Sequence, residues 1–134
     1  MMSAGPTATP PMFQPGLFET GESGPCLLGS RCRRCRRTFF PRVEVCLDCL
    51  ADDPEPVRLS RHGILECFTT VSMPALHIEP PYSVGYVALA DGPRVFAPLE
   101  PIDGGFEVGM KMRLADYALG RAAERRLAYC FVRA

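Results

Sequence analysis

The sequence predicts an all-β protein in which a small cysteine-rich ribbon precedes a barrel of five strands. Two observations support this prediction. The first is the segment RCRRCRRTFFPRVEVCLDC, residues 31–49, which contains two CxxC pairs with ten residues between them. The second is a series of short apolar runs after residue 56 that have the period of strands and are separated by turn residues.

The chain divides into three parts where its composition changes. Residues 1–16 are rich in proline, serine, threonine, alanine and glycine, and we expect them to form a flexible tail. Residues 17–56 hold the ribbon and a short segment before it, in which glycine and proline leave room for at most a short helical turn. The acidic, proline-containing ADDPEP at 51–56 marks the junction, and we assign residues 57–134 to the barrel domain.

Cys32, Cys35, Cys46 and Cys49 are the candidate metal ligands. Two CxxC turns can present four thiolates tetrahedrally to one ion, and Zn²⁺ takes four cysteines in closed structural sites. A redox-active CxxC is the alternative, but it needs a single pair in a βαβ context, and no helix pattern follows either pair here. The sequence therefore predicts a four-cysteine zinc ribbon with one Zn²⁺ per chain, which folds the segment and does not activate water.

Five apolar runs predict the strands of the barrel. They are residues 57–59 continuing past Gly63 into ILECFTTV, then YSVGYVALA, RVFAPLE, MKMRLADYAL and LAYCFV. DGP between the second and third runs is a tight-hairpin signal, and Gly63 would allow a bulge at which the first strand bends. Five strands with such a bend fit a small closed barrel, for which the five-stranded OB-fold is the commonest solution.

The predicted strands differ in how their faces alternate. In the fourth run Met112 and Leu114 alternate with Lys111 and Arg113, which predicts one buried and one exposed face. The second and fifth runs are apolar on both faces, and strands of this kind are covered on both. Because a small barrel has one interior, we expect a helix, the ribbon or a partner protein to supply the second cover.

The charges of the chain balance, with fifteen Lys and Arg against fifteen Asp and Glu. No global field therefore draws the chain to a polyanion or an acidic membrane, and any basic feature is local. The N-terminal sequence lacks the basic and apolar regions of a signal peptide, and no apolar run is long enough to span a bilayer. These features favour a cytoplasmic protein without a membrane partner, in which paired cysteines more often bind metal than form disulfides.

No residue is predicted to be catalytic. The chain has no nucleophile elbow, P-loop, HExxH or dinucleotide fingerprint, and His62 and His77 are isolated. Cys67 and Cys130 lie in apolar runs and are expected to be small buried hydrophobic residues. Cys26 lies near the first CxxC and is a minor candidate for a spare ligand.

Four segments together resemble, in order, the family that combines a rubredoxin-like zinc ribbon with an acyl-CoA-associated OB-fold. They are LLGSRCRRCRRTFFPRVEVCLDC, RHGILECFTTV, PPYSVGYVALADGPRVFAPLE and VGMKMRL, and the likeness covers roughly residues 17–132. Members look like non-catalytic small subunits of thiolases, thiolase-type aldolases and related acyl-CoA enzymes, such as the small subunit of benzoylsuccinyl-CoA thiolase. One departure is that the family commonly has a glycine after each CxxC, where this chain has Arg36 and Leu50.

The resemblance implies an accessory subunit that supports assembly and acyl-CoA binding or channelling. Its partner would be a thiolase-fold catalytic subunit in a hetero-oligomer, with a coenzyme A thioester as the substrate of the complex. The candidate contacts to the CoA phosphates or to the partner are Arg33, Arg34, Arg36 and Arg37, because guanidinium groups bind phosphate and carboxylate through paired hydrogen bonds.

Three other interpretations stay open at this point. In the first, the arginine run is a solvated ribbon tip paired with acidic neighbours, namely Glu44, Asp48, Asp52 and Asp53. In the second, the chain binds nucleic acid and stacks bases on Tyr86, Phe96 and Tyr117, although its zero net charge disfavours this. In the third, the chain is a free-standing enzyme, which the missing catalytic motif disfavours.

Overall fold

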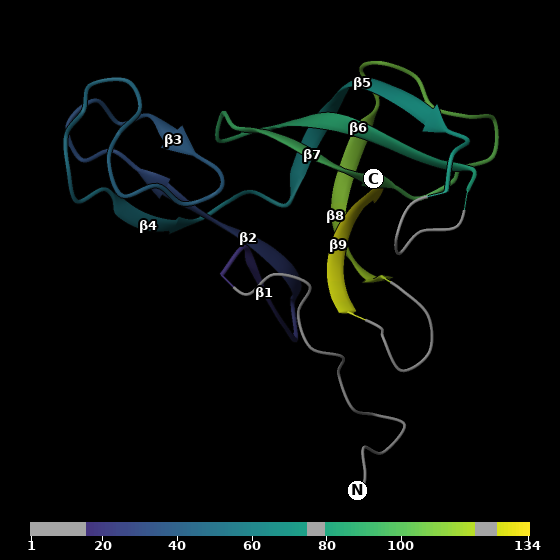
Figure 1. The fold of residues 1–134 in the computed structure, drawn as a ribbon, viewed down its shortest axis with the longest axis horizontal. Coiled ribbons are helices and arrows are strands. Elements are labelled where there is room, and N and C mark those ends of the chain that lie inside the picture. The colour runs from purple at the N-terminus through teal and green to yellow at the C-terminus, as the bar shows by residue number, and fades with distance from the viewer. Residues whose placement is uncertain (1–15, 75–79, 120–125) are drawn as a thin grey trace, which may run out of the picture.

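The computed structural model describes residues 16–74, 80–119 and 126–134, and these residues form strands and connecting loops (Figure 1). The all-β fold class predicted from the sequence is confirmed. Among the described residues no helix is long and apolar enough to cross a membrane. The predicted flexible tail lies outside the described residues apart from residue 16, as do His77 and most of the predicted polar link at 120–126.

The described residues contain nine strands in two connected parts, an N-terminal sheet and a closed barrel. The sheet contains β1 (Phe18–Gly21), β2 (Gly24–Arg31), β3 (Thr38–Phe39) and β4 (Glu55–Arg58). The barrel contains β5 (His62–Val71), β6 (Tyr82–Leu89), β7 (Arg94–Leu99), β8 (Lys111–Leu119) and β9 (Arg126–Arg133). Figure 1 shows the β3–β4 end of the sheet projecting away from the barrel, with β2 running between the two parts.

The barrel has the strand order β5-β6-β7-β9-β8 and closes where β8 pairs with β5. Neighbouring strands are antiparallel except β7 and β9, which pair in parallel at Leu99 and Phe131. The DGP turn joins β6 to β7 as predicted, since the Leu89 amide donates to the Pro93 carbonyl at 2.9 Å and Gly92 adopts φ 119°. This order is that of a five-stranded Greek-key barrel of the OB type.

The segment before the ribbon forms a strand hairpin, so the expectation of a helical turn is wrong. β1 and β2 pair in register from Phe18 opposite Leu27 to Gly21 opposite Gly24. The two glycines that interrupt the apolar pattern sit at the turn of this hairpin, where Gly24 adopts φ 97°. Both Phe18 and Leu27 are buried, because the hairpin packs against the barrel.

The apolar run expected to be the first barrel strand is divided between two strands. Its beginning is in β4, which pairs with β2 of the N-terminal sheet, and the barrel begins only with β5. The bulge of β5 lies between Leu65 and Cys67, not at Gly63. Gly63 allows close approach instead, because a Cβ there would lie 2.5 Å from the carbonyl oxygen of Ala88 on β6.

One hydrophobic core extends through both parts of the molecule. Its buried members include Phe18, Leu27 and Leu59 from the N-terminal part, and Leu65, Val87, Val95, Met112, Leu114 and Phe131 from the barrel. The alternation predicted for β8 is confirmed, with Met112 and Leu114 buried and Lys111 and Arg113 exposed. The ribbon part is therefore anchored to the barrel through β1 and β2.

The two strands predicted to be covered on both faces differ in the structure. In β9, residues 127, 128 and 130–132 are buried, and the ring of Tyr129 packs in T-shaped pairs with those of Phe18 and Phe40 at centroid distances of 5.5 and 6.2 Å. The N-terminal part therefore packs against the face of β9 that carries Tyr129. In β6 the outward-facing Tyr86 is exposed beside Phe96 of β7, so the described residues leave this part of β6 uncovered, and its cover by a partner protein stays a prediction.

Candidate metal centre and ribbon surface

Two backbone turns of the same geometry carry the four cysteines. We call residues 32–37 the first knuckle and residues 46–51 the second knuckle. In the first knuckle the Arg36 amide donates to the Cys32 carbonyl at 3.1 Å, and in the second the Leu50 amide donates to the Cys46 carbonyl at 3.1 Å. Each knuckle is closed by one more backbone bond of 2.9 Å, from the first cysteine to the carbonyl five residues later.

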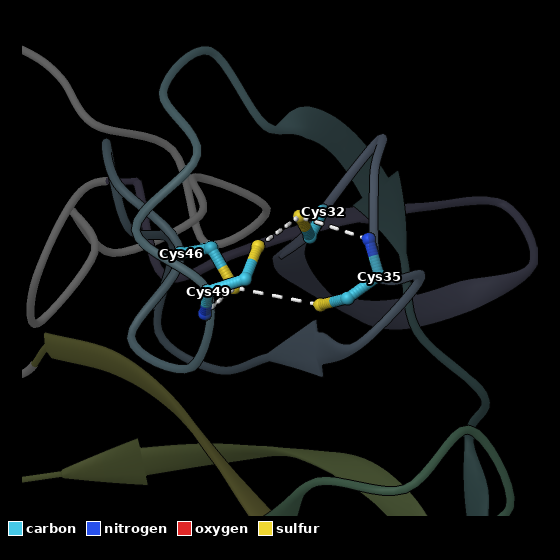
Figure 2. Close-up of side chains that lie close together, drawn as sticks. All are labelled: Cys32, Cys35, Cys46 and Cys49. Atoms are coloured by element: carbon cyan, nitrogen blue, oxygen red, sulfur yellow. Dashed lines mark hydrogen bonds between the residues drawn. The ribbon is translucent and has the colours of Figure 1, made fainter.

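The sulfur atoms of Cys32, Cys35, Cys46 and Cys49 all lie within 4.8 Å of one another. Figure 2 shows these side chains converging from the two knuckles, with 3.5 Å between the sulfurs of Cys32 and Cys49 and 3.6 Å between those of Cys35 and Cys46. A tetrahedral zinc centre with four Zn–S bonds of about 2.3 Å has its sulfurs about 3.8 Å apart. The cluster therefore has the dimensions that one zinc ion requires.

Backbone amides point at the first sulfur of each pair. The amides of Arg34 and Cys35 donate to the Cys32 sulfur at 3.4 Å, and those of Asp48 and Cys49 donate to the Cys46 sulfur at 3.4 Å. An N–H group that donates to a thiolate stabilises its negative charge. The fold of each knuckle thus supports a charged ligand.

The four thiols differ in acidity. The Cys35 amide is the main cause that lowers the pKa of Cys32 to about 6, and the Cys49 amide lowers the pKa of Cys46 in the same way. The Arg37 amide also acts to lower the pKa of Cys35, but burial and the neighbouring thiols outweigh it and raise that pKa to about 12. Four thiolates this close repel one another, so a divalent cation at their centre stabilises the fully deprotonated set.

The residue after each CxxC has a left-handed backbone. Arg36 has φ 68° and Leu50 has φ 65°, a region that glycine adopts without strain. The turn therefore forms at both positions although neither residue is glycine. A side chain in this region costs about 1–2 kcal/mol relative to the right-handed conformation, so both knuckles are strained at the same position.

The four predicted arginines fall into two pairs with different surroundings. Arg33 donates to the Asp53 carbonyl at 2.8 Å and lies 3.9 Å from a Glu55 carboxylate oxygen, and Arg37 lies 3.7 Å from an oxygen of Asp48. Arg34 and Arg36 are exposed and form no ion pair with any residue that the structure describes. The interpretation of a tip paired to acidic neighbours thus holds for Arg33 and Arg37 only.

The second knuckle exposes apolar side chains that the sequence interpretation missed. Leu47 and Leu50 are 70% and 75% exposed, and Val45, directly before the knuckle, is 41% exposed. The matched geometry places Leu47 at the position of Arg33, and Leu50 at the position of Arg36. The signal was present in the sequence CLDCL, because leucines that flank metal ligands in a tight turn have no interior to enter.

The remaining cysteines lie outside the sulfur cluster. Cys26 is buried and its thiol donates to the Leu59 carbonyl at 3.6 Å, which accounts for it without a metal. Cys130 is buried as expected, and burial raises its pKa to about 11. Cys67 is exposed, so the expectation of burial is wrong there, because the bulge after Leu65 places Cys67 beside the exposed Tyr86.

Two aromatic residues proposed for base stacking do come together on the barrel. The rings of Tyr86 and Phe96 lie 5.1 Å apart on β6 and β7, while Tyr117 lies on β8. The cation next to this pair, Arg94, is bound to Glu66 at 2.7 Å. Arg94 is therefore already paired within the chain and is not free to bind a nucleic-acid backbone.

Comparison with known proteins identifies the family. The family model described as "ChsH2, rubredoxin-like zinc ribbon domain" matches residues 27–55, and the one described as "ChsH2, C-terminal OB-fold domain" matches residues 56–115. The benzoylsuccinyl-CoA thiolase subunit BbsA of Thauera aromatica is 36% identical over 104 residues, which cover 76% of this chain and 72% of that protein. The chain belongs to the ChsH2 family.

One further relative and one solved structure are also similar to this chain. A DUF35 domain-containing scaffold protein of Methanocaldococcus jannaschii is 30% identical over 73 residues, which are 52% of each chain. A solved structure of an Ltp2-ChsH2(DUF35) aldolase superposes with a TM-score of 0.68 at 24% identity, over 81% of this chain and 84% of that one. The resemblance and the ribbon-plus-barrel fold predicted from the sequence are thus confirmed, and the four cysteines form a zinc-ribbon site consistent with Zn²⁺.

Proposed function

We propose that this ChsH2-family chain is a zinc-binding accessory subunit of a cytoplasmic, CoA-dependent thiolase- or aldolase-type complex. The observation that carries the proposal is its 36% identity to a benzoylsuccinyl-CoA thiolase subunit across 72% of that protein. A more distant relative is described as a scaffold protein, which is consistent with a role in assembly. In this proposal a thiolase-fold partner carries the catalytic residues, and the two proteins form a hetero-oligomer.

The zinc in this proposal is structural, with Cys32, Cys35, Cys46 and Cys49 as its four ligands. Four thiolates complete a tetrahedral coordination shell, so no position is left for water or substrate. Within residues 32–50 only Cys32 and Cys46 are buried, so this segment has almost no apolar core of its own. One zinc per chain would supply the cross-link that such a segment needs in order to fold.

The arginines of the first knuckle are the proposed contacts of this subunit with CoA phosphates or with the partner. Arg33 and Arg37 already face carboxylates of their own chain. That leaves Arg34 and Arg36 as the cations that are available to another molecule, among the four predicted. A hollow of about 310 Å³ lies beside the β1–β2 turn, but it is a poorer candidate for binding CoA phosphates. Glu19 and Glu22 line it, and its Arg58 is bound to Glu19 at 2.6 Å.

The proposal is tested by co-expression with the thiolase-fold protein encoded in the same organism. We expect one stable complex by size-exclusion chromatography with light scattering, and one zinc per accessory chain by metal analysis. We also expect acyl-CoA turnover by the complex and none by the accessory chain alone. An accessory chain that turns over acyl-CoA alone, or that elutes separately from the thiolase-fold protein, would contradict the proposal. Retention of single-stranded DNA at physiological salt would favour the nucleic-acid alternative instead.

A further inference from the structure

The tip of the ribbon combines apolar and cationic side chains on two turns of the same shape. The second knuckle exposes Leu47 and Leu50, and the first exposes Arg34 and Arg36. The two knuckles meet at the sulfur cluster, and the contact of Arg37 with Asp48 at 3.7 Å also joins them. These four side chains therefore belong to one end of the molecule, which we call the ribbon tip.

Leu50 is unfavourable at its position for two independent reasons. Its backbone has φ 65°, a conformation that glycine adopts without strain, and its side chain is 75% exposed to water. Neither disadvantage is offset by burial of Leu50 within the described chain. The knuckle requires the left-handed backbone, but it does not require a leucine there, and the exposed apolar side chain at a strained position indicates a contact outside the chain.

The cations of the ribbon tip show the same kind of exposure. Arg36 occupies the equivalent strained position of the first knuckle with φ 68°, and neither it nor Arg34 has an ion-pair partner among the described residues. Guanidinium groups at an interface pair with carboxylates through two parallel hydrogen bonds. A complementary surface would therefore have carboxylates next to an apolar recess.

We propose that the ribbon tip, formed by Leu47, Leu50, Arg34 and Arg36, is the surface that docks onto the thiolase-fold partner, in an apolar recess bordered by carboxylates. This inference rests on the proposed function. CoA phosphates match the two arginines but give no reason for two exposed leucines beside them. A protein surface matches both, and apolar anchors next to charged hydrogen-bond donors are typical of interface centres. The metal-held turns are also ordered before binding, which reduces the entropy lost on association.

The test measures the affinity of purified variants for the thiolase-fold partner by biolayer interferometry. We expect the double variant Leu47→Ser with Leu50→Gly to weaken binding at least tenfold. Val108→Ser is the matched control, because Val108 is 67% exposed on the loop between β7 and β8, and we expect less than a twofold change from it. We expect Arg34→Ala to weaken binding more at low salt than at high salt, without changing the KM of the complex for acyl-CoA.

The single variant Leu50→Gly distinguishes a role in docking from a role in folding, because we expect it to stabilise the ribbon but to weaken binding of the partner. It removes the strained side chain, so the free variant should lose zinc to a chelator more slowly than the natural chain, and at the same time bind the partner more weakly. Equal affinity of the natural chain and the double leucine variant would overturn the inference and leave the proposed function intact. A raised KM for acyl-CoA with unchanged affinity in Arg34→Ala would assign the arginines to CoA and also overturn it. Failure of the natural chain to bind the partner would overturn the proposed function itself.

Discussion

The ribbon tip and the barrel of this chain are stabilised by different means. In the barrel, Leu65, Val87, Met112 and Phe131 are completely buried and strand pairing closes the sheet. In residues 32–50 only two side chains are buried, and both are cysteines of the sulfur cluster. The barrel is thus held by apolar burial, whereas the geometry of the ribbon favours a metal cross-link.

This difference determines which side chains of each part are free to contact another molecule. A strand in the barrel directs about every second side chain into the core, so only its outer face is free to vary. In the knuckles the cysteines and the backbone set the shape, and almost every other side chain is directed to solvent. The same backbone turn can therefore expose an arginine in the first knuckle and a leucine in the second, as Arg36 and Leu50 show.

The largest expected effect is the loss of one ligand. We expect Cys46→Ser to abolish zinc retention on desalting and to unfold residues 32–50, because structural zinc contributes about 10–16 kcal/mol to the folding of small zinc modules. The barrel should keep its fold. Metal analysis and amide NMR spectra measure the two outcomes separately, with Cys67→Ser as the control because Cys67 is exposed and outside the cluster. A variant that retains full zinc would refute the ligand assignment.

Removal of an aromatic ring from the core tests whether apolar burial stabilises the barrel. Phe131 is completely buried in the hydrophobic core, and we expect Phe131→Ala to lower the free energy of unfolding by about 3–5 kcal/mol. Phe96→Ala is the matched control, because that ring is 55% exposed, and we expect it to cost about 1 kcal/mol or less. Urea denaturation measures both. Equal losses in the two variants would show that burial does not control the stability of the barrel.

Gly63→Ala tests the close approach of two barrel strands. The new Cβ would lie 2.5 Å from the Ala88 carbonyl oxygen, so we expect a loss of about 1–3 kcal/mol in urea denaturation, with unchanged zinc content. Gly21→Ala is the control, because no atom lies within 4 Å of its Cβ position, and we expect about 0.5 kcal/mol or less. A loss of zinc from Gly63→Ala would show that the two parts are coupled more tightly than proposed.

The smallest expected effect is a stabilisation, whereas the variants above are expected to destabilise the protein. Arg36→Gly relieves a left-handed backbone at φ 68°, partly offset by the greater freedom of glycine in the unfolded chain. We expect a net stabilisation of about 0.5–1 kcal/mol in the ribbon, seen as slower zinc transfer to a chelator, and no change in the urea midpoint of the barrel. Faster zinc transfer from the variant would mean that the arginine side chain supports the knuckle.

Local sequence patterns predicted much of the fold and of the site. The grouping of the four cysteines follows from CxxC spacing alone, because the backbone of a knuckle is set by a few adjacent residues. The faces of β8 follow from the alternation of Met112 and Leu114 with Lys111 and Arg113, and the turn before β7 follows from DGP. In each case the determining interactions lie close together in the chain.

The features that were missed depend on partners far away in the sequence. The β1–β2 hairpin looked too broken by glycine to form, but it is stabilised by burial of Phe18 and Leu27 against the barrel. Cys67 was expected in the core, and a bulge next to it moved it to the exposed face. Arg33 differs from its neighbour Arg34 in that it contacts Asp53 and Glu55, and these two residues lie about twenty positions further along the chain.

In this account a metal ion stabilises the ribbon, whereas apolar burial stabilises the barrel. Amide hydrogen exchange, measured with zinc and after chelation, is the most direct test of this difference. We predict that chelation removes protection from the knuckle amides of Cys32, Arg36, Cys46 and Leu50, which close the two turns. The amides of β6, β7 and β9 should stay protected, together with the part of β2 that pairs with β1. Loss of protection in β6 and β9 at the same chelator concentration, or knuckle amides that stay protected without zinc, would contradict the account.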